Sequence, residues 1–258
     1  DLQYAYKFGS LIQINERLKS KLKRLSDLVV DAEMANQMDM FASAEVDQHH
    51  DFATSFFSNL KTAIEQYAQT QGNTFLTSKT RDAITFLELL TTEYDVAIAN
   101  PPYTSRRDYG PELKAFIDNN YRKPFDTYIN LYSCFIQRLN QLLIKYGKLA
   151  MVTPMTFMFI STFEETRKLI LTQYHINLFI QYGFGGMFSE SVDPAMFVLE
   201  KGVAREESTF VKLDMYFTDS KKEIFTTTLV DHINSAKNQH VYRLDQKRIF
   251  EIVSHPFI

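Results

Sequence analysis

Cysteine and tryptophan are nearly missing from this chain of 258 residues, which contains one Cys and no Trp. A single cysteine excludes a disulfide framework within the chain and fits a reducing, cytoplasmic setting. That cysteine, Cys134, lies in an apolar, helix-like run, where a thiol packs as a small hydrophobe. We therefore expect Cys134 to be a core residue.

Long hydrophobic runs and an excess of basic charge are also missing. No stretch of about 20 apolar residues occurs, so the sequence predicts no transmembrane helix and no membrane partner, and no signal peptide opens the chain. The formal net charge is −3, so any contact with nucleic acid must come from a local basic patch. Hydrophobic residues make up 45% of the chain, which is enough for one sizeable core.

The pattern along the chain predicts three parts. Residues 1–92 are expected to be mainly helical, with helices over 52–69 and 78–90 and with Ser78 or Thr80 as a cap. Residues 93–217 alternate between strand and helix and are expected to form an α/β core. Residues 218–258 are expected to begin a connection to a further region of the protein.

The α/β part is expected to be a doubly wound sheet with an antiparallel edge. YDVAIAN (94–100) predicts a buried parallel strand, and the two strands over 195–201 and 209–217 are close enough in sequence to pair antiparallel. The other expected strands are 148–154 and 175–183. The expected helices are 112–120, 127–145 with Asp126 as cap and Gly147 as stop, and one opened by a Thr162/Glu165 capping box and running to about 173.

The strongest chemical signal is Asn100-Pro101-Pro102-Tyr103, directly after the first expected strand. Ligands of open α/β sheets bind beyond the carboxyl ends of strands. The Asn100 side-chain oxygen and the Pro101 carbonyl can accept hydrogen bonds from an aromatic amine, which localises its lone pair toward an incoming methyl group. Two prolines stiffen the backbone, and Tyr103 offers a flat face on which a base can stack.

A base paired inside a duplex cannot reach such a pocket, so it has to be flipped out. The alternative interpretation is that the tetrapeptide is an ordinary turn, because Asn-Pro and Pro-Pro dipeptides mark turns. Its place after an apolar strand and before α/β alternation favours the functional interpretation.

YDVAIANPPY resembles motif IV of the class I, S-adenosylmethionine-dependent N6-adenine DNA methyltransferases. FGSLI, FDTYINLYSCFIQR, GKLAMVTP and FISTFEETRKLIL look like successive blocks of the PglX methylases of BREX phage-defence systems and of restriction-modification methylases. The resemblance implies a Rossmann-like sheet, S-adenosylmethionine as cofactor and double-stranded DNA as substrate, with other defence subunits as possible partners and no metal. It assigns Asn100, Pro101 and Tyr103 to the target adenine and Pro102 to the shape of the turn. It also implies that 218–258 leads toward a target-recognition region.

Four further residues are candidates for substrate contact. Phe157 and Phe159 follow a strand end and can line the base pocket, although core packing is the alternative for both. Arg106 and Arg107 lie in a locally basic stretch beside the tetrapeptide and can contact phosphates, although an ordinary solvated loop is the alternative.

The cofactor half of such a site is not evident in the sequence. The family needs a glycine-rich turn after its first strand and an acidic residue after its second, and neither precedes Asn100. Gly183, Gly185 and Gly186 follow a strand but open no expected helix, so residues 183–188 are expected to be a substrate-side loop. With Asp1 as its first residue, the chain is expected to begin after the first half of the catalytic domain and to bind the cofactor weakly.

Two other functions stay open. One is a DNA-binding or assembly module that keeps the fold without turnover. The other is methylation of amines on RNA bases or of protein glutamine, since related motifs serve those substrates.

Overall fold

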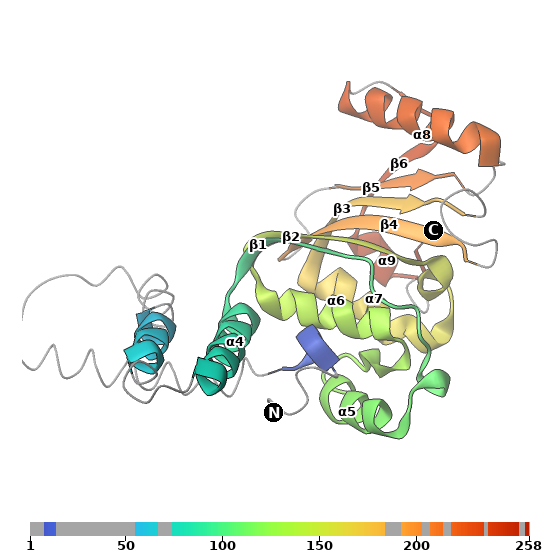
Figure 1. Cartoon of the computed structure of the whole chain (residues 1–258). Helices are drawn as coiled ribbons and strands as arrows, with labels where there is room; N and C mark the ends of the chain where they lie inside the picture. The colour runs from blue at the N-terminus through green and yellow to red at the C-terminus, as the bar shows by residue number, and fades with distance from the viewer. Residues whose placement is uncertain are drawn as a thin grey trace, which may run out of the picture. The chain divides into compact units, whose positions relative to one another are not determined.

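The computed structural model describes residues 8–13, 55–66, 74–183, 192–202, 207–213, 218–234, 237–252 and 256–257. The chain divides into two units, Asp1–Thr92 and Glu93–Ile258, and the second unit carries the sheet (Figure 1).

The first unit is helical where it is described. It holds the short 3₁₀ helix η2 (Gly9–Leu11), a helix over residues 55–66, and α4 (Thr74–Thr91). Phe57 and Ile84 are buried together and join the last two helices. The helix expected over 78–90 is confirmed within α4, and the one expected over 52–69 is confirmed over 55–66, while its remaining residues lie outside the described ones. The expected caps are wrong, because Ser78 and Thr80 lie inside α4.

The second unit is built on a six-stranded mixed sheet with the order β1-β2-β4-β3-β5-β6, which confirms the α/β class. β1 is parallel to β2, and β3 is parallel to β5. β4 runs antiparallel between β2 and β3, and β6 is antiparallel to β5. The strands are β1 (Tyr94–Ala99), β2 (Leu143–Pro154), β3 (Tyr174–Gln181), β4 (Pro194–Lys201), β5 (Glu207–Lys212) and β6 (Val241–Asp245).

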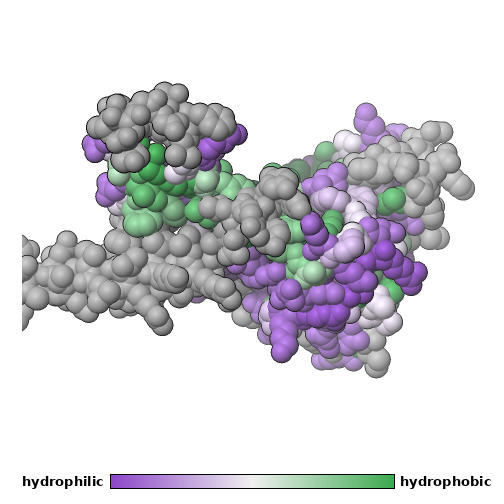
Figure 2. All heavy atoms as spheres, turned by 60° about the horizontal axis from the view of Figure 1, so that its bottom comes forward, coloured by the Kyte–Doolittle hydropathy of each residue, from purple (hydrophilic) through white to green (hydrophobic). Residues whose placement is uncertain are grey.

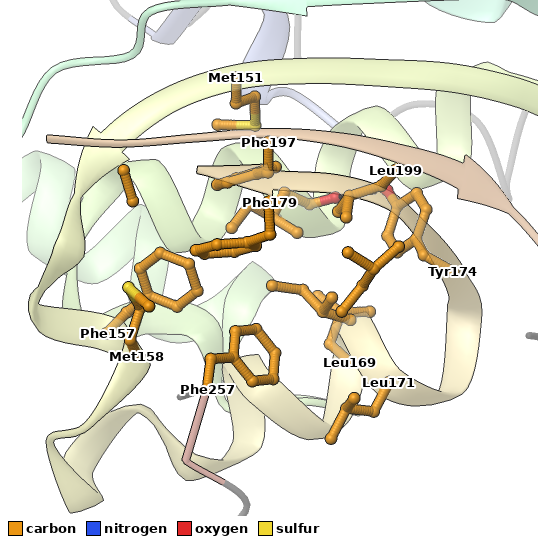
Figure 3. Packing of buried hydrophobic residues seen from close by; sticks show 14 of the residues in the cluster. Met151, Phe157, Met158, Leu169, Leu171, Tyr174, Phe179, Phe197, Leu199 and Phe257 are labelled. Carbon is orange, nitrogen blue, oxygen red and sulfur yellow. Dashed lines mark hydrogen bonds between the residues drawn. The ribbon is translucent and has the colours of Figure 1, made fainter. Parts of the chain in front are cut away.

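Helices α6 and α7 cover one face of this sheet, which we call the inner face (Figure 1). Inner-face side chains of β2, β3 and β4 form a core with aromatic residues at its centre, where Phe179 and Phe197 stack at 5.5 Å between ring centroids (Figure 3). The helical elements of this unit are η3 (Arg106–Asp108), α5 (Pro111–Tyr121), η4 (Thr127–Ile129), α6 (Leu131–Leu142), η5 (Met155–Met158), η6 (Ser161–Phe163), α7 (Glu164–Gln173), α8 (Thr218–Ile233) and α9 (Lys247–Phe250).

The opposite, outer face is covered unevenly within the described residues. Ile224 and Phe225 of α8 pack against side chains of β3 and β5. A shallow apolar hollow lies toward β1 and is lined by residues that include Ile98, Val152 and Val198. The prediction that β1 is parallel is confirmed. The prediction that it is buried is wrong, since Ile98 is 80% exposed on the outermost strand of the described sheet.

Three local predictions fail for identifiable reasons. The helix expected over 127–145 begins as α6 at Leu131 and ends at Leu142, because Asn130 caps it and β2 starts at Leu143; Gly147 lies inside β2. Asp126 adopts a left-handed conformation and makes no capping hydrogen bond. The Thr162/Glu165 capping box is not formed, because 3₁₀ turn η6 leads directly into α7.

The expected pairing of the strands over 195–201 and 209–217 is also wrong. The first strand exists as β4, and the second exists as β5 up to Lys212, while residues 214–217 lie outside the described ones. β3 lies between β4 and β5. β4 pairs along its length with β2 and with β3, from Pro194 to Lys201. A strand with two apolar neighbours buries more surface than a hairpin at the sheet edge would.

Candidate functional site

The Asn-Pro-Pro-Tyr residues, here called the NPPY segment (residues 100–103), leave the sheet at its carboxyl edge. This is the edge where β1, β2 and β3 end and β4 begins. Ala99 is level with Met151, so β2 continues to Pro154 beside the segment. Asn100 and Pro102 are exposed, whereas Pro101 is buried. The segment therefore lies where α/β sheets bind their ligands.

Tyr103 folds back over the start of the segment. Its hydroxyl donates a hydrogen bond of 2.9 Å to Oδ1 of Asn100 and lies 3.5 Å from the carbonyl oxygen of Val152. Partial burial raises the pKa of Tyr103 above its usual value, so the phenol keeps the proton that it donates. This bond orients the Asn100 amide and leaves its oxygen a second lone pair for another donor.

The residues that follow the segment are tied to the start of α6. The backbone N–H of Leu131 donates to the carbonyl oxygen of Thr104 at 3.1 Å, and Ser105 forms an isolated antiparallel bridge with Asn130. Asn130 is a residue that was not predicted from the sequence. The available signal was an Asn directly before an apolar helical run, which is a preferred N-cap.

The loop after β2 separates the two candidate phenylalanines. Phe157 is fully buried and packs against Phe179, Phe197 and Phe257, so the core-packing alternative describes its place (Figure 3). Phe159 is 44% exposed on the same loop, past the carboxyl edge of β2. Of the two, Phe159 is the one with an exposed ring.

A buried arginine holds this loop in shape. Arg167 of α7 donates from Nη1 to the carbonyl oxygens of Phe157 at 2.6 Å and of Ile160 at 2.8 Å. Burial lowers the pKa of the Arg167 guanidinium from its usual value, although arginine stays protonated at neutral pH. Nothing in the local sequence pattern distinguishes Arg167 from a solvated helix residue, so sequence reasoning missed it.

The two candidate arginines differ in their surroundings. Arg106 forms a two-pronged ion pair with Asp118, at 3.0 Å from Nε and 2.6 Å from Nη2. Hydrogen bonding to Arg106 lowers the pKa of Asp118, and Arg122 lies 3.5 Å from the same carboxylate. Arg107 is exposed, and its backbone N–H donates to the Ser105 hydroxyl. Arg107 is thus the more accessible cation.

Gly183 lies at the same edge, two residues after the end of β3. It has a φ of +70°, which favours glycine, and its N–H donates to the Pro194 carbonyl at 3.4 Å. The rest of the expected substrate-side loop, including Gly185 and Gly186, lies outside the described residues.

The described residues contain neither a metal-binding cluster nor a glycine-rich cofactor turn. No group of three or more His, Cys, Asp or Glu side chains in this part of the chain can hold a metal ion. In the same part, no glycine-rich turn joins a strand to the first turn of a helix: Gly147 lies inside β2, and Gly110 caps α5 after a loop. The described residues therefore do not fit a nucleotide-type cofactor. A membrane-crossing helix, long and apolar, is likewise not found among them.

The chain is similar in sequence to two curated methyltransferases. It is 27% identical over 157 residues to the adenine-specific methyltransferase BrxX of Escherichia coli O9:H4 (strain HS), covering 58% of this chain and 12% of that protein. It is 26% identical over 182 residues to the adenine-specific methyltransferase PglX of Lacticaseibacillus casei (strain Zhang), covering 68% and 14%. The chain thus spans about one eighth of the length of these relatives.

Among solved structures, the methyltransferase subunit of a type I restriction-modification system from Streptococcus thermophilus matches with a TM-score of 0.49 and 19% identity, covering 64% of this chain and 37% of that one. The profile of the Eco57I restriction-modification methylases matches residues 11–188, which is more than half of the chain. The chain belongs to the Eco57I restriction-modification methylase family.

Proposed function

We propose that this chain supplies the base-binding part of an enzyme that transfers a methyl group from S-adenosylmethionine to N6 of adenine in DNA. The observation that carries the proposal is the Asn100 side chain, exposed at the carboxyl edge with its oxygen oriented by Tyr103. The family and the adenine-specific names of the two curated relatives support this choice of reaction.

The proposed chemistry uses the NPPY segment as a rigid acceptor pair. The amine of adenine shares its lone pair with the ring and is a poor nucleophile in that state. Hydrogen bonds from its two hydrogens to Asn100 Oδ1 and to the Pro101 carbonyl would draw the lone pair out of conjugation and toward the methyl donor. The Tyr103 ring would stack on the base and offset part of the cost of flipping it, at about 1–3 kcal/mol per stacked base.

We place the methyl-donor site outside the described residues of this chain, because these residues do not form a cofactor cradle. The exposed edge of β1 supports that division. Val96 is 56% exposed and Ile98 is 80% exposed on a strand of the parallel type, which in α/β sheets is covered on both faces. Further strands and helices beside β1 would cover them and bring in the cofactor.

Cofactor binding by the chain alone tests this division. Isothermal titration of this chain with S-adenosylmethionine is expected to show no tight binding. A clean one-site isotherm with a Kd of about 1–10 μM, equivalent to about −7 to −8 kcal/mol, would place the cofactor half within the chain.

For DNA contact, we propose that Arg107 binds phosphate, whereas Arg106 is held back by Asp118. Replacing Arg107 with Ala should weaken DNA binding and reduce the salt slope of the affinity by about one ion, since each phosphate contact releases about 0.9 counterion. Arg106→Ala is the comparison and should change the slope less. Equal slopes for Arg107→Ala and the unmodified protein would end this assignment.

The substrate is tested with labelled methyl groups. The full-length protein that contains this chain is incubated with labelled S-adenosylmethionine and, separately, with unmethylated double-stranded DNA, RNA and protein. The expected product is N6-methyladenine in digested DNA. Label in RNA or in protein glutamine and none in DNA would change the substrate. Tight DNA binding without transfer would support the second candidate, a DNA-binding module, which the missing cofactor cradle among the described residues favours.

A further inference from the structure

Asn130 makes three kinds of contact that together join the exit of the NPPY segment to the core. Its Nδ2 donates to the carbonyl oxygen of Tyr103 at 3.3 Å, and its Oδ1 accepts from the backbone N–H of Tyr132 at 3.3 Å. Its backbone forms the bridge with Ser105. The residue is only 8% exposed, so water competes little for these bonds.

The element at the other end of this connection is rigid. Asn130 is the N-cap of α6, and α6 inserts Tyr132 and Ile136 into the core, where each is at most 1% exposed. Tyr132 also stacks on Phe163 at 5.6 Å between ring centroids. A helix held in this way is a fixed reference point, because packed cores yield little to small forces.

The chain of contacts then runs outward to the proposed acceptor. Asn130 holds the Tyr103 carbonyl, and the Tyr103 hydroxyl holds Oδ1 of Asn100. The two bonds fix both ends of the tyrosine that joins the cap to the acceptor. We propose that Asn130 is a positioning residue. Through these two hydrogen bonds it fixes the orientation of the Asn100 amide and of the Tyr103 ring. This inference rests on the proposed function.

An N-cap role alone would predict a different behaviour from a positioning role. Capping needs only an acceptor on residue 130, which Asp and Ser supply as well as Asn does. Holding the Tyr103 carbonyl needs a donor that reaches it, and Asp has none. Asn130→Asp therefore keeps the capping acceptor for the Tyr132 N–H and loses the hydrogen bond to the Tyr103 carbonyl. Asn130→Ser also keeps a capping oxygen and is neutral, which separates loss of the amide donor from the added charge.

The test compares these variants in the full-length protein by methyl transfer to DNA and by thermal unfolding. Both variants are expected to lower kcat by about 10- to 100-fold, because a misplacement of about 1 Å in a reacting pair costs about 100-fold. The KM for DNA should stay within about 3-fold, since phosphate contacts are separate from Asn130. Tm should fall by no more than about 3 °C, because the cap is retained. Asn234→Asp, at the exposed end of α8, is the matched control and should leave kcat unchanged.

Two results would overturn the inference while leaving the proposed function in place. One is a kcat for Asn130→Asp and Asn130→Ser within about 3-fold of the unmodified protein, less than about 0.7 kcal/mol of barrier. The other is a fall in kcat that is matched by a large fall in Tm in both variants, which would show a structural role only. If the unmodified protein transfers no methyl group to DNA, the proposed function fails and this inference fails with it.

Discussion

At the scale of single residues, Phe157 and Phe159 lie on one loop, but the first packs in the core and the second is exposed at the surface. Phe157 is wholly buried between rings of β3 and β4, and its carbonyl is held by Arg167. Phe159 lies between the two carbonyls that Arg167 binds and is 44% exposed. The buried arginine therefore fixes the backbone on both sides of an exposed aromatic ring.

Because one ring is buried and the other is exposed, replacement by Ala should affect the free energy of unfolding very differently at the two positions. Phe157→Ala should lower the free energy of unfolding by about 3–5 kcal/mol, through lost burial and the cavity left behind. Phe159→Ala should lower it by less than about 0.5 kcal/mol, as for other surface changes, and should weaken binding of the flipped base. Urea unfolding of both variants measures the first effect. A loss of stability above about 2 kcal/mol for Phe159→Ala would contradict its surface role.

At the scale of elements, Gly147 lies where β2 comes close to β1 and their register changes. β2 shifts register against β1 between Tyr94 and Val96, and Tyr146 has a φ of +68° at this point. A Cβ on Gly147 would lie 3.0 Å from the Ile144 carbonyl oxygen and 3.1 Å from that of Asp95. The glycine lets the two parallel strands approach each other where the register changes.

Gly147→Ala should therefore destabilise the sheet unit by about 1–3 kcal/mol, the usual cost of overpacking against backbone atoms that cannot turn away. Gly110→Ala is the matched control, because a Cβ there meets nothing within 4 Å. Its cost should stay below about 1 kcal/mol, for an N-cap change. Denaturant unfolding of both variants gives the comparison, and equal costs would disprove the close approach at Gly147.

Some elements of the fold could be predicted from the sequence and others could not. Apolar β-branched runs locate β1 to β5, and the Asn-Pro-Pro-Tyr pattern locates the candidate acceptor, because both signals are local. The place of β4 between β2 and β3 is set by the total apolar surface buried, which no local pattern states. The side-chain bonds of Asn130 and Arg167 were not predicted, because each ends on a backbone carbonyl, of Tyr103 and of Phe157, which residue type does not reveal.

At the scale of the whole molecule, the last part of the chain belongs to the sheet unit. β6 extends the sheet beyond β5, and Phe257 donates its N–H to the Met158 carbonyl while its ring enters the core (Figure 3). Gln246 is buried and bonds to three separate elements. It accepts from Ile176 N and Ser208 Oγ, and its Nε2 donates to the Leu171 and Tyr174 carbonyls.

The solvent-facing side of the helical layer is more polar than the core that it covers. Figure 2, in which the bottom of Figure 1 comes forward, shows mostly hydrophilic side chains over the sheet unit. The outer face near β1, by contrast, carries the apolar hollow.

Gln246→Leu should lower the free energy of unfolding by about 3 kcal/mol, because it leaves the Ile176 N–H and two carbonyls without their partner at about 1–3 kcal/mol for each buried group. Gln239→Leu, at an exposed position before β6, is the control and should change stability by less than about 0.5 kcal/mol. Thermal unfolding of the chain measures both. A Gln246→Leu protein as stable as the unmodified one would show that the buried network is not needed to hold β6 and α9.

The proposed function depends most on Asn100 as the acceptor of the amine of the target adenine. The most direct measurement is single-turnover methyl transfer to DNA by the full-length protein with Asn100→Ala, beside circular dichroism and Tm of the same variant. We predict a loss of rate of about 100- to 1,000-fold, as for removal of one oriented hydrogen-bonding group from an active site, with an unchanged fold. Transfer at a rate within about 10-fold of the unmodified protein, a difference of about 1.4 kcal/mol, would contradict the claim.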